Sequence, residues 1–225
     1  AAGVAFAPSV LAHSKSLKGK TILLVSGWQY HNIGDIAHTP GLLQLLNLYL
    51  PETKVILWPN HEVRSIDEML LHHFPDMRIV NGELEDGEVS SEAVLQAAQK
   101  ADFLLHGSGP SIVGAGKVAW WKAKMGKPYG IYGTTIGFVN DQYRDLIGGA
   151  DFLFTRETHS IEKVQEEMKR PPKVLEFGPD ATFAMHLQDP LKAQRFLQEK
   201  GLETGKFICV VRSEEHTSEL QSLLI

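Results

Sequence analysis

The residue types that suggest chemistry gather in short segments, each of which follows a run of apolar residues. The first is Asn32-Ile33-Gly34-Asp35, a turn that would let the backbone approach a ligand and would place the Asp35 carboxylate near the beginning of a helix. His38 follows three residues later. Carboxylates and imidazoles act as general acids and bases, so Asp35 and His38 are candidate catalytic residues. Asn32 and Gly34 are candidate substrate contacts, and helix capping is an equal explanation for Asp35.

A second segment, His106-Gly107-Ser108-Gly109-Pro110-Ser111, consists mainly of small residues and precedes a predicted helix. Backbone amides and a helix N-terminus can bind an anion. This makes Gly107, Ser108 and Gly109 candidate substrate-binding residues, with His106 a candidate acid or base. Glycines after strands also mark ordinary turns, and a lone Gly-x-Gly is more often a turn than a phosphate site.

Three more segments follow later strands, and each contains hydroxyl or charged side chains. Their candidate substrate-binding residues are Thr134, Arg156, Glu157, Ser160 and Asp180. The planar guanidinium of arginine can bind a carboxylate or phosphate through two parallel hydrogen bonds, so Arg156 is the main candidate for an anion contact. The alternatives are a structural ion pair of Arg156 with Glu157 or Asp180, and helix capping by Ser160.

The elements that would position these residues alternate along the chain. Apolar runs without alternation indicate strands buried on both faces, and they span residues 21–26, 54–58, 78–80, 102–105, 129–132, 152–154, 174–177 and 207–211. Helical patterns lie between them at residues 40–50, 65–74, 91–100, 116–125, 142–147, 160–169 and 190–200. This order predicts an α/β fold with a doubly wound, Rossmann-like parallel sheet, in which ligands bind beyond the carboxyl ends of the strands.

The composition excludes several classes of protein. A net charge of −5 argues against a nucleic-acid partner. The lone cysteine, Cys209, rules out an internal disulfide framework and a cysteine-cluster metal site. His72 and His73 are adjacent and point in different directions, so no metal site is predicted. No apolar run reaches the roughly 18 residues that a transmembrane helix needs.

The two ends of the chain differ from the rest. Residues 1–12 are small and apolar, and Ala5-Phe6-Ala7 has the form of a signal-peptide cleavage site. Residues 1–18 are therefore a possible signal-peptide remnant, and a disordered N-terminus explains them equally well. Residues 212–225 show no periodic pattern, and Arg212–Ser222 resembles a translated sequencing adaptor. The predicted domains are therefore an N-terminal Rossmann-like domain at residues 19–180 and the start of a truncated second domain at residues 181–211.

Taken in order, the segments N-x-G-D, H-G-S-G-P-S, Y-G-T-T-I-G, R-E-x-x-S and P-D-A resemble the polysaccharide pyruvyl transferase family over roughly Thr21–Val211. The resemblance implies the first half of a two-domain GT-B-like architecture with the active site between the halves. It also implies transfer of a pyruvyl group from phosphoenolpyruvate, as a co-substrate without a further cofactor, to a sugar of a surface or cell-wall polysaccharide, forming a ketal. The family's other site residues lie in the second half, so we expect this fragment alone to be inactive.

Two features depart from the family pattern: the continuation Ile36-Ala37-His38-Thr39-Pro40, and Glu157 where aspartate is frequent. Two alternative functions therefore stay open, a GT-B-like glycosyltransferase and a catalytically idle glycan-binding relative. The resemblance implies a cytoplasmic protein, whereas a signal remnant would imply export. The acceptor sugar and the oligomeric state are left open.

Overall fold

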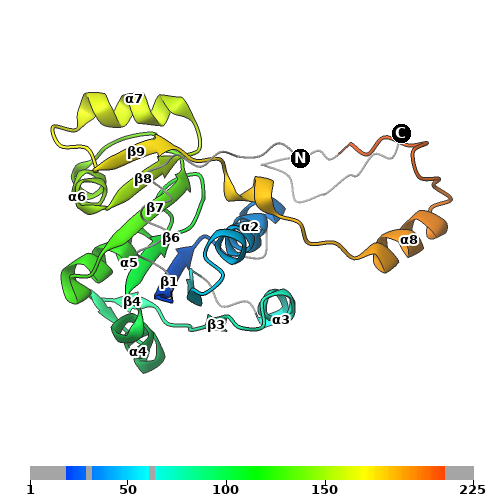
Figure 1. Ribbon diagram of the computed structural model, residues 1–225, viewed down its shortest axis with the longest axis horizontal. Helices are drawn as coiled ribbons and strands as arrows, with labels where there is room; N and C mark the ends of the chain where they lie inside the picture. The colour runs from blue at the N-terminus through cyan, green and yellow to red at the C-terminus, as the bar shows by residue number, and fades with distance from the viewer. Residues whose placement is uncertain (1–18, 29–31, 61–63, 211–225) are drawn as a thin grey trace. The chain divides into compact units, whose positions relative to one another are not determined.

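The computed structural model describes residues 19–28, 32–60 and 64–210 (Figure 1). The predicted signal remnant and the predicted artefactual tail lie outside these residues. Within them, seven parallel strands form one sheet: β1 (Thr21–Ser26), β2 (Lys54–Pro59), β3 (Arg78–Ile79), β6 (Phe103–His106), β7 (Tyr129–Thr134), β8 (Phe152–Thr155) and β9 (Val174–Phe177). The continuous apolar runs of the sequence form these strands because helices cover both faces of the sheet.

The strand order is β3-β2-β1-β6-β7-β8-β9, so the chain builds the sheet outward in both directions from the β1–β6 pair. This confirms the predicted α/β fold with a doubly wound, Rossmann-like parallel sheet. In such sheets the crevice at the reversal point, beyond the carboxyl ends of the two central strands, is the usual ligand position. The reversal point therefore selects the segments after β1 and β6 as the first places to look for a site.

The helices lie on opposite faces of this sheet (Figure 1). The main apolar core joins one face to the four helical segments that follow β5, β6, β7 and β8; these are α4 (Glu92–Lys100), α5 (Ala115–Trp120) with its π-helical continuation η1 (Trp121–Met125), α6 (Asp141–Gly149) and α7 (Thr158–Glu167). Helix α2 (Ile33–Tyr49) packs on the other face, where the Ser26 and Thr39 hydroxyl oxygens are 2.7 Å apart. Trp28 is fully buried, and its indole N–H donates to Asp67 of α3 (Arg64–His73) at 2.9 Å.

Helix α2 begins seven residues before its predicted start. Asn32 is its N-cap and accepts a hydrogen bond from the Gly34 amide at 2.9 Å, so Asn32–Asp35 forms the cap and first turn of a helix rather than an open turn. The prediction failed because Pro40 lies inside the helix, where proline costs about 3 kcal/mol and normally ends helical structure. Burial of Pro40 together with seven other residues of α2 favours the helix despite this cost.

Two more differences concern strands. A two-stranded hairpin, β4 (Leu84–Glu85) and β5 (Glu88–Val89), was not predicted, although its turn residues Asp86 and Gly87 are a common hairpin signal. The strand predicted at 207–211 is wrong for its described part: residues 207–210 form no strand, and their side chains are exposed. An apolar segment becomes a strand only where a neighbouring strand accepts its backbone hydrogen bonds.

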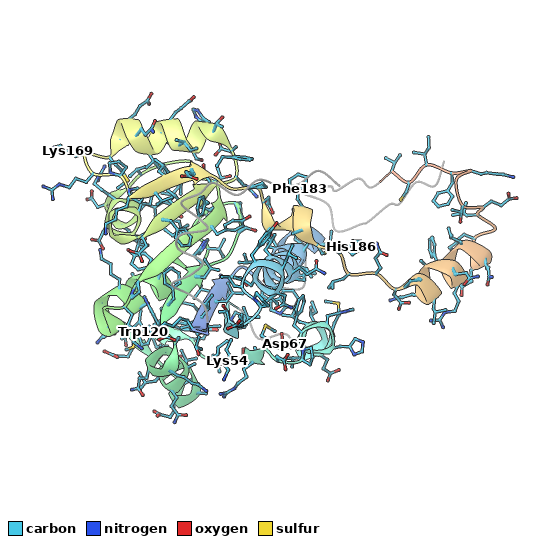
Figure 2. The ribbon with its side chains drawn as sticks, viewed as in Figure 1. Lys54, Asp67, Trp120, Lys169, Phe183 and His186 are labelled. Carbon is cyan, nitrogen blue, oxygen red and sulfur yellow. The ribbon has the colours of Figure 1, made fainter. Side chains whose placement is uncertain are left out.

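The chain divides into two compact units, residues 1–186 and 187–225. The short 3₁₀ helix η2 (Ala181–Ala184) packs on α2, and the predicted start of a second domain at residue 181 stays a prediction. Figure 2 shows this arrangement, with Phe183 on η2 beside α2. Helix α8 (Pro190–Glu199) is the regular element of the second unit.

Candidate functional site

The candidate site is built around the carboxylate of Asp180, which follows β9. One carboxylate oxygen lies 2.9 Å from Nδ1 of His38 in α2, and the other accepts a hydrogen bond from Nη1 of Arg156 at 2.8 Å. Arg156 follows β8 and also donates from Nε to the Thr135 hydroxyl at 2.8 Å. Side chains that follow four different strands thus meet at the carboxyl edge of the sheet, as expected for a doubly wound fold.

Ser108 also belongs to this group of side chains. It lies in the segment after β6, one of the two central strands at the reversal point. Its Oγ lies 2.5 Å from Nδ1 of His38 and accepts a hydrogen bond from the Ala181 amide at 3.3 Å. Both side chains are buried. Ser108 and Asp180 contact the same imidazole nitrogen, whereas a nucleophilic Ser-His-Asp triad needs them on opposite ring nitrogens. The arrangement is therefore not that of a nucleophilic Ser-His-Asp triad.

The environment of Asp180 keeps its carboxylate ionised. Burial alone would raise the pKa, but the hydrogen bonds from His38, from the Thr182 amide and from Arg156 outweigh it and hold the pKa well below its usual range. Charged-form hydrogen bonding and a neighbouring cation both act in this direction. Asp180 is thus a half-buried anion that is paired with a guanidinium.

Glycines allow the backbones of this cluster to approach closely. A Cβ at Gly41 would stand 2.0 Å from the carbonyl oxygen of Ala181, so only glycine fits where α2 touches η2. Gly133 has a left-handed backbone with φ of 62°, and a Cβ there would stand 2.7 Å from Cβ of Ser108. These two positions bring His38 and Ser108 within reach of Asp180.

Two threonines lie side by side at the end of β7. Thr134 was the predicted binding residue, but its neighbour Thr135 is the one that contacts the cluster. Thr134 is fully buried at the end of β7, whereas Thr135 accepts the Arg156 hydrogen bond. The pairing of β7 with β8 shifts register between Ile131 and Thr134, where Gly133 has its left-handed conformation. This irregularity decides which threonine faces the site, and simple alternation along a strand does not predict it.

The predicted binding residues Glu157 and Ser160 are engaged with each other at the beginning of α7. Glu157 is the N-cap of this helix, and its carboxylate accepts hydrogen bonds from the Ser160 amide at 2.9 Å and from the Ser160 hydroxyl. Burial raises the pKa of Glu157, but these hydrogen bonds outweigh it and lower the pKa. Ser160 in turn accepts from the Ile136 amide at 2.7 Å. The pair therefore fixes the segment that carries Arg156.

His106 is the last residue of β6 and is fully buried, with neither ring nitrogen hydrogen-bonded to a side chain or water among the described residues. Burial lowers its pKa to about 4; the backbone of Val113 opposes this effect and the charge of His38 adds to it. His106 is thus neutral at pH 7. It occupies the sheet interior between Val25 and Ile131, so the structure does not place it among the side chains around Asp180.

The remaining predicted residues are two glycines in the segment after β6 and three residues at the start of α2. Gly107 donates its amide to the Val25 carbonyl at 2.7 Å and Gly109 to the Gly133 carbonyl at 3.2 Å, so both amides that were candidates for anion binding are satisfied within the protein. Asn32, Gly34 and Asp35 lie at the start of α2, at least three residues before His38.

Lys117 is a buried cation that belongs to none of the predicted site segments. Its ammonium group lies 4.6 Å from the centre of the Trp58 ring and donates to the Pro59 carbonyl oxygen at 2.5 Å. Burial lowers the pKa of this lysine to about 8, with the charge of Glu83 opposing the change. These contacts connect α5 to the end of β2, apart from the Asp180 cluster.

Among the described residues, no group of three or more histidine, cysteine, aspartate or glutamate side chains is arranged to hold a metal ion. A search of the same residues finds no helix that is both long and apolar enough to span a membrane.

Several solved structures resemble this chain. MnaA of S. aureus, in a co-structure with UDP, matches 79% of this chain and 51% of its own, at 16% identity and a TM-score of 0.50. A putative UDP-N-acetylglucosamine 2-epimerase from Listeria monocytogenes matches 68% of this chain and 44% of its own, at 17% identity and a TM-score of 0.45. UGT71G1 of Medicago truncatula, complexed with UDP-glucose, matches 80% and 56%, at 10% identity and a TM-score of 0.47. The chain thus spans about half the length of the structures it matches.

No curated protein matches the sequence at the significance applied. The family model for polysaccharide pyruvyl transferases does match, over residues 32–220, and this range contains every residue of the Asp180 cluster. A match over most of the chain decides the family, and it agrees with the order of the strand-end segments. The chain belongs to the polysaccharide pyruvyl transferase family.

Proposed function

We propose that the protein transfers a pyruvyl group from phosphoenolpyruvate to a sugar of a surface or cell-wall polysaccharide, forming a cyclic ketal. The observation that supports this most is the convergence of Arg156, His38 and Ser108 on Asp180 at the carboxyl edge of the sheet, in a chain of this family. The cluster combines a fixed cation with a group that can exchange protons, and the reaction needs both.

The reaction sets clear chemical requirements. Two sugar hydroxyls form bonds to C2 of phosphoenolpyruvate, its C3 methylene takes up a proton to become a methyl group, and the bond from C2 to the phosphate oxygen breaks. One hydroxyl proton balances the new methyl group, and the other leaves with the phosphate. A general acid and base and cationic donors for the anionic groups are therefore required.

Each requirement has a candidate in the cluster. Arg156 uses two of its five N–H groups in the bonds to Asp180 and Thr135, and its side chain is 28% exposed. We assign to it the phosphate or carboxylate of phosphoenolpyruvate. His38 is the proton-exchanging group. Its position in the family-atypical continuation of the first segment makes it a feature of this chain rather than one carried over from the family pattern.

The decisive experiment measures phosphate release from phosphoenolpyruvate by the protein encoded by the complete gene and by this chain. Acceptors are a panel that includes β-mannosaminides and galactosides. We expect release that depends on an acceptor, together with a pyruvylated product in the mass spectrum, from the protein of the complete gene and not from this chain alone. Transfer of a sugar from a nucleotide sugar in its place would support the glycosyltransferase alternative, and acceptor binding without either transfer would support the idle relative.

A further inference from the structure

Both carboxylate oxygens of Asp180 already have partners in the protein. The oxygen that contacts His38 also accepts the Thr182 amide at 2.9 Å, and the other oxygen holds Arg156 at 2.8 Å. The side chain is only 14% exposed. These contacts point to a task toward His38 and Arg156, which differs from the direct substrate contact expected from the sequence.

The first part of that task concerns the proton on His38. An ionised carboxylate only accepts hydrogen bonds, so an approach of 2.9 Å between Nδ1 and Asp180 requires the proton to be on Nδ1. Ser108 Oγ is also within 2.5 Å of Nδ1 and accepts from the Ala181 amide, which is consistent with Oγ acting as a second acceptor of the same proton. We assign the Nδ1–H tautomer on this basis, and Nε2 is then the ring nitrogen that carries no proton in the neutral imidazole.

The second part concerns the direction of Arg156. A guanidinium held at Nη1 by a carboxylate and at Nε by a hydroxyl has a fixed plane, because two hydrogen bonds to different acceptors prevent rotation about the last side-chain torsions. The same carboxylate thus controls a proton-exchanging group and a cation. Gly41, one helical turn after His38, allows α2 to touch η2, which directly follows Asp180.

We propose that Asp180 is a positioning residue which holds His38 in the Nδ1–H tautomer and fixes the Arg156 guanidinium, so that the two groups face the substrate as one oriented pair. The proposal rests on the proposed function for the identity of that substrate, since phosphoenolpyruvate supplies the anionic groups for Arg156. The tautomer and the orientation themselves are properties of the protein without ligand.

The test of the tautomer uses two-bond ¹H–¹⁵N correlation spectra of this chain with ¹⁵N-labelled histidine, recorded without ligand, and His38→Gln identifies the His38 signals. We expect neutral His38 of the unmodified chain to carry its proton on Nδ1. Asp180→Asn keeps the shape but offers one acceptor oxygen to the three donors of His38, Thr182 and Arg156, so Nε2–H signal should appear. Ser108→Ala should keep Nδ1–H because Asp180 remains. Neutral His38 with Nε2–H in the unmodified chain, or a switch in Ser108→Ala and not in Asp180→Asn, would overturn the proposal.

The test of Arg156 is a double-mutant cycle measured as the Kd for phosphoenolpyruvate by calorimetry. Asp180→Asn should weaken binding about tenfold, as expected for losing one charge-assisted hydrogen bond, and should have no further effect once Arg156 is alanine. Additive effects would overturn the link between the two residues. Asp141→Asn, at a fully exposed carboxylate paired with Arg144, is the matched control and should leave the Kd unchanged.

The two experiments separate this proposal from the proposed function. If the unmodified chain binds no phosphoenolpyruvate, the function fails while the tautomer spectra still decide the role of Asp180 toward His38. If phosphoenolpyruvate binds and the tautomer does not depend on Asp180, the positioning role fails and the function stands. The spectra of the unmodified chain decide the tautomer even if Asp180→Asn does not fold.

Discussion

Arg156 is a partly exposed cation whose partners come from two other strand ends. At this scale the first prediction is that Arg156→Ala weakens phosphoenolpyruvate binding about tenfold or more, because a charge-assisted contact to the anion is lost. Arg156→Lys should recover only part of the affinity, since an ammonium group cannot replace the planar guanidinium. The Kd is measured by calorimetry.

Arg144→Ala is the matched control for this prediction. Arg144 is about half exposed and pairs with Asp141 three residues earlier in α6, away from the cluster. Loss of this surface ion pair should leave the Kd unchanged. An equal Kd for Arg156→Ala and the unmodified chain would remove Arg156 from the binding site.

The second prediction at the residue scale concerns His106. Burial lowers its folded-state pKa from the usual 6.5 to about 4, so the unfolded chain binds more protons between these two pH values. His106 therefore makes the free energy of unfolding fall as the pH is lowered from 6.5 toward 4, with a slope of at most about 1.4 kcal/mol per pH unit. Urea unfolding at several pH values measures this slope.

His106→Leu removes the titrating group and should flatten that part of the pH profile. His73→Gln, at an exposed position in the last turn of α3, is the control and should leave the slope unchanged. The same slope in His106→Leu and in the unmodified chain would show that another group causes the pH dependence.

The sequence identified most of the side chains around Asp180 but not how they connect. The rule that ligands bind at strand ends selected His38, Ser108, Arg156 and Asp180. The contacts among them join residues up to 142 positions apart, and no local pattern specifies such contacts. The sequence pointed to Thr134 and not to Thr135. The reason is the register shift in β7, which reverses the alternation of side chains between the two faces of the strand.

At the scale of elements, the packing of α2 against η2 depends on Gly41. The third prediction is that Gly41→Ala lowers the free energy of unfolding by about 1–3 kcal/mol, since the new methyl group would overlap the Ala181 carbonyl and force the two elements apart. Because Asp180 precedes η2, the same change should also weaken phosphoenolpyruvate binding. Denaturant unfolding and calorimetry measure the two effects.

Gly116→Ala in α5 is the matched control for Gly41→Ala. A Cβ at Gly116 meets only Leu84 at an ordinary distance of 3.7 Å. Alanine there should leave stability unchanged or raise it by up to about 1 kcal/mol, because alanine favours helix more than glycine does. Unchanged stability of Gly41→Ala would contradict the close packing of α2 and η2.

Strands and most helices were predictable because continuous apolar runs and helical spacing are local signals. β1 and β9 have the predicted boundaries, and the other strands of the sheet differ by one or two residues at an end. The start of α2 was not predictable, because tertiary packing favours a helix through Pro40. The strand predicted for residues 207–210 was wrong because tertiary pairing is absent there: the apolar segment has no strand to pair with in the described structure.

At the scale of the whole molecule, the chain forms two compact units that meet at residues 186–187. The fourth prediction is that limited proteolysis by an enzyme of broad specificity cleaves first at residues 187–189, which have no regular secondary structure. A stable fragment that ends near His186 should accumulate, as measured by mass spectrometry. Earlier cleavage between β1 and β9 would contradict the assignment of the first unit.

The late position of Asp180 in the sequence has a consequence for biosynthesis. A ribosome releases His38, Ser108 and Arg156 before Asp180, so the growing chain holds a histidine and a guanidinium at the sheet edge before their shared counter-charge exists. Completion of the cluster therefore coincides with the arrival of the last strand, β9, and of η2. A nascent protein stalled just before residue 180 would contain all seven sheet strands but not the carboxylate that joins His38 to Arg156, so the site is assembled only after the sheet is complete.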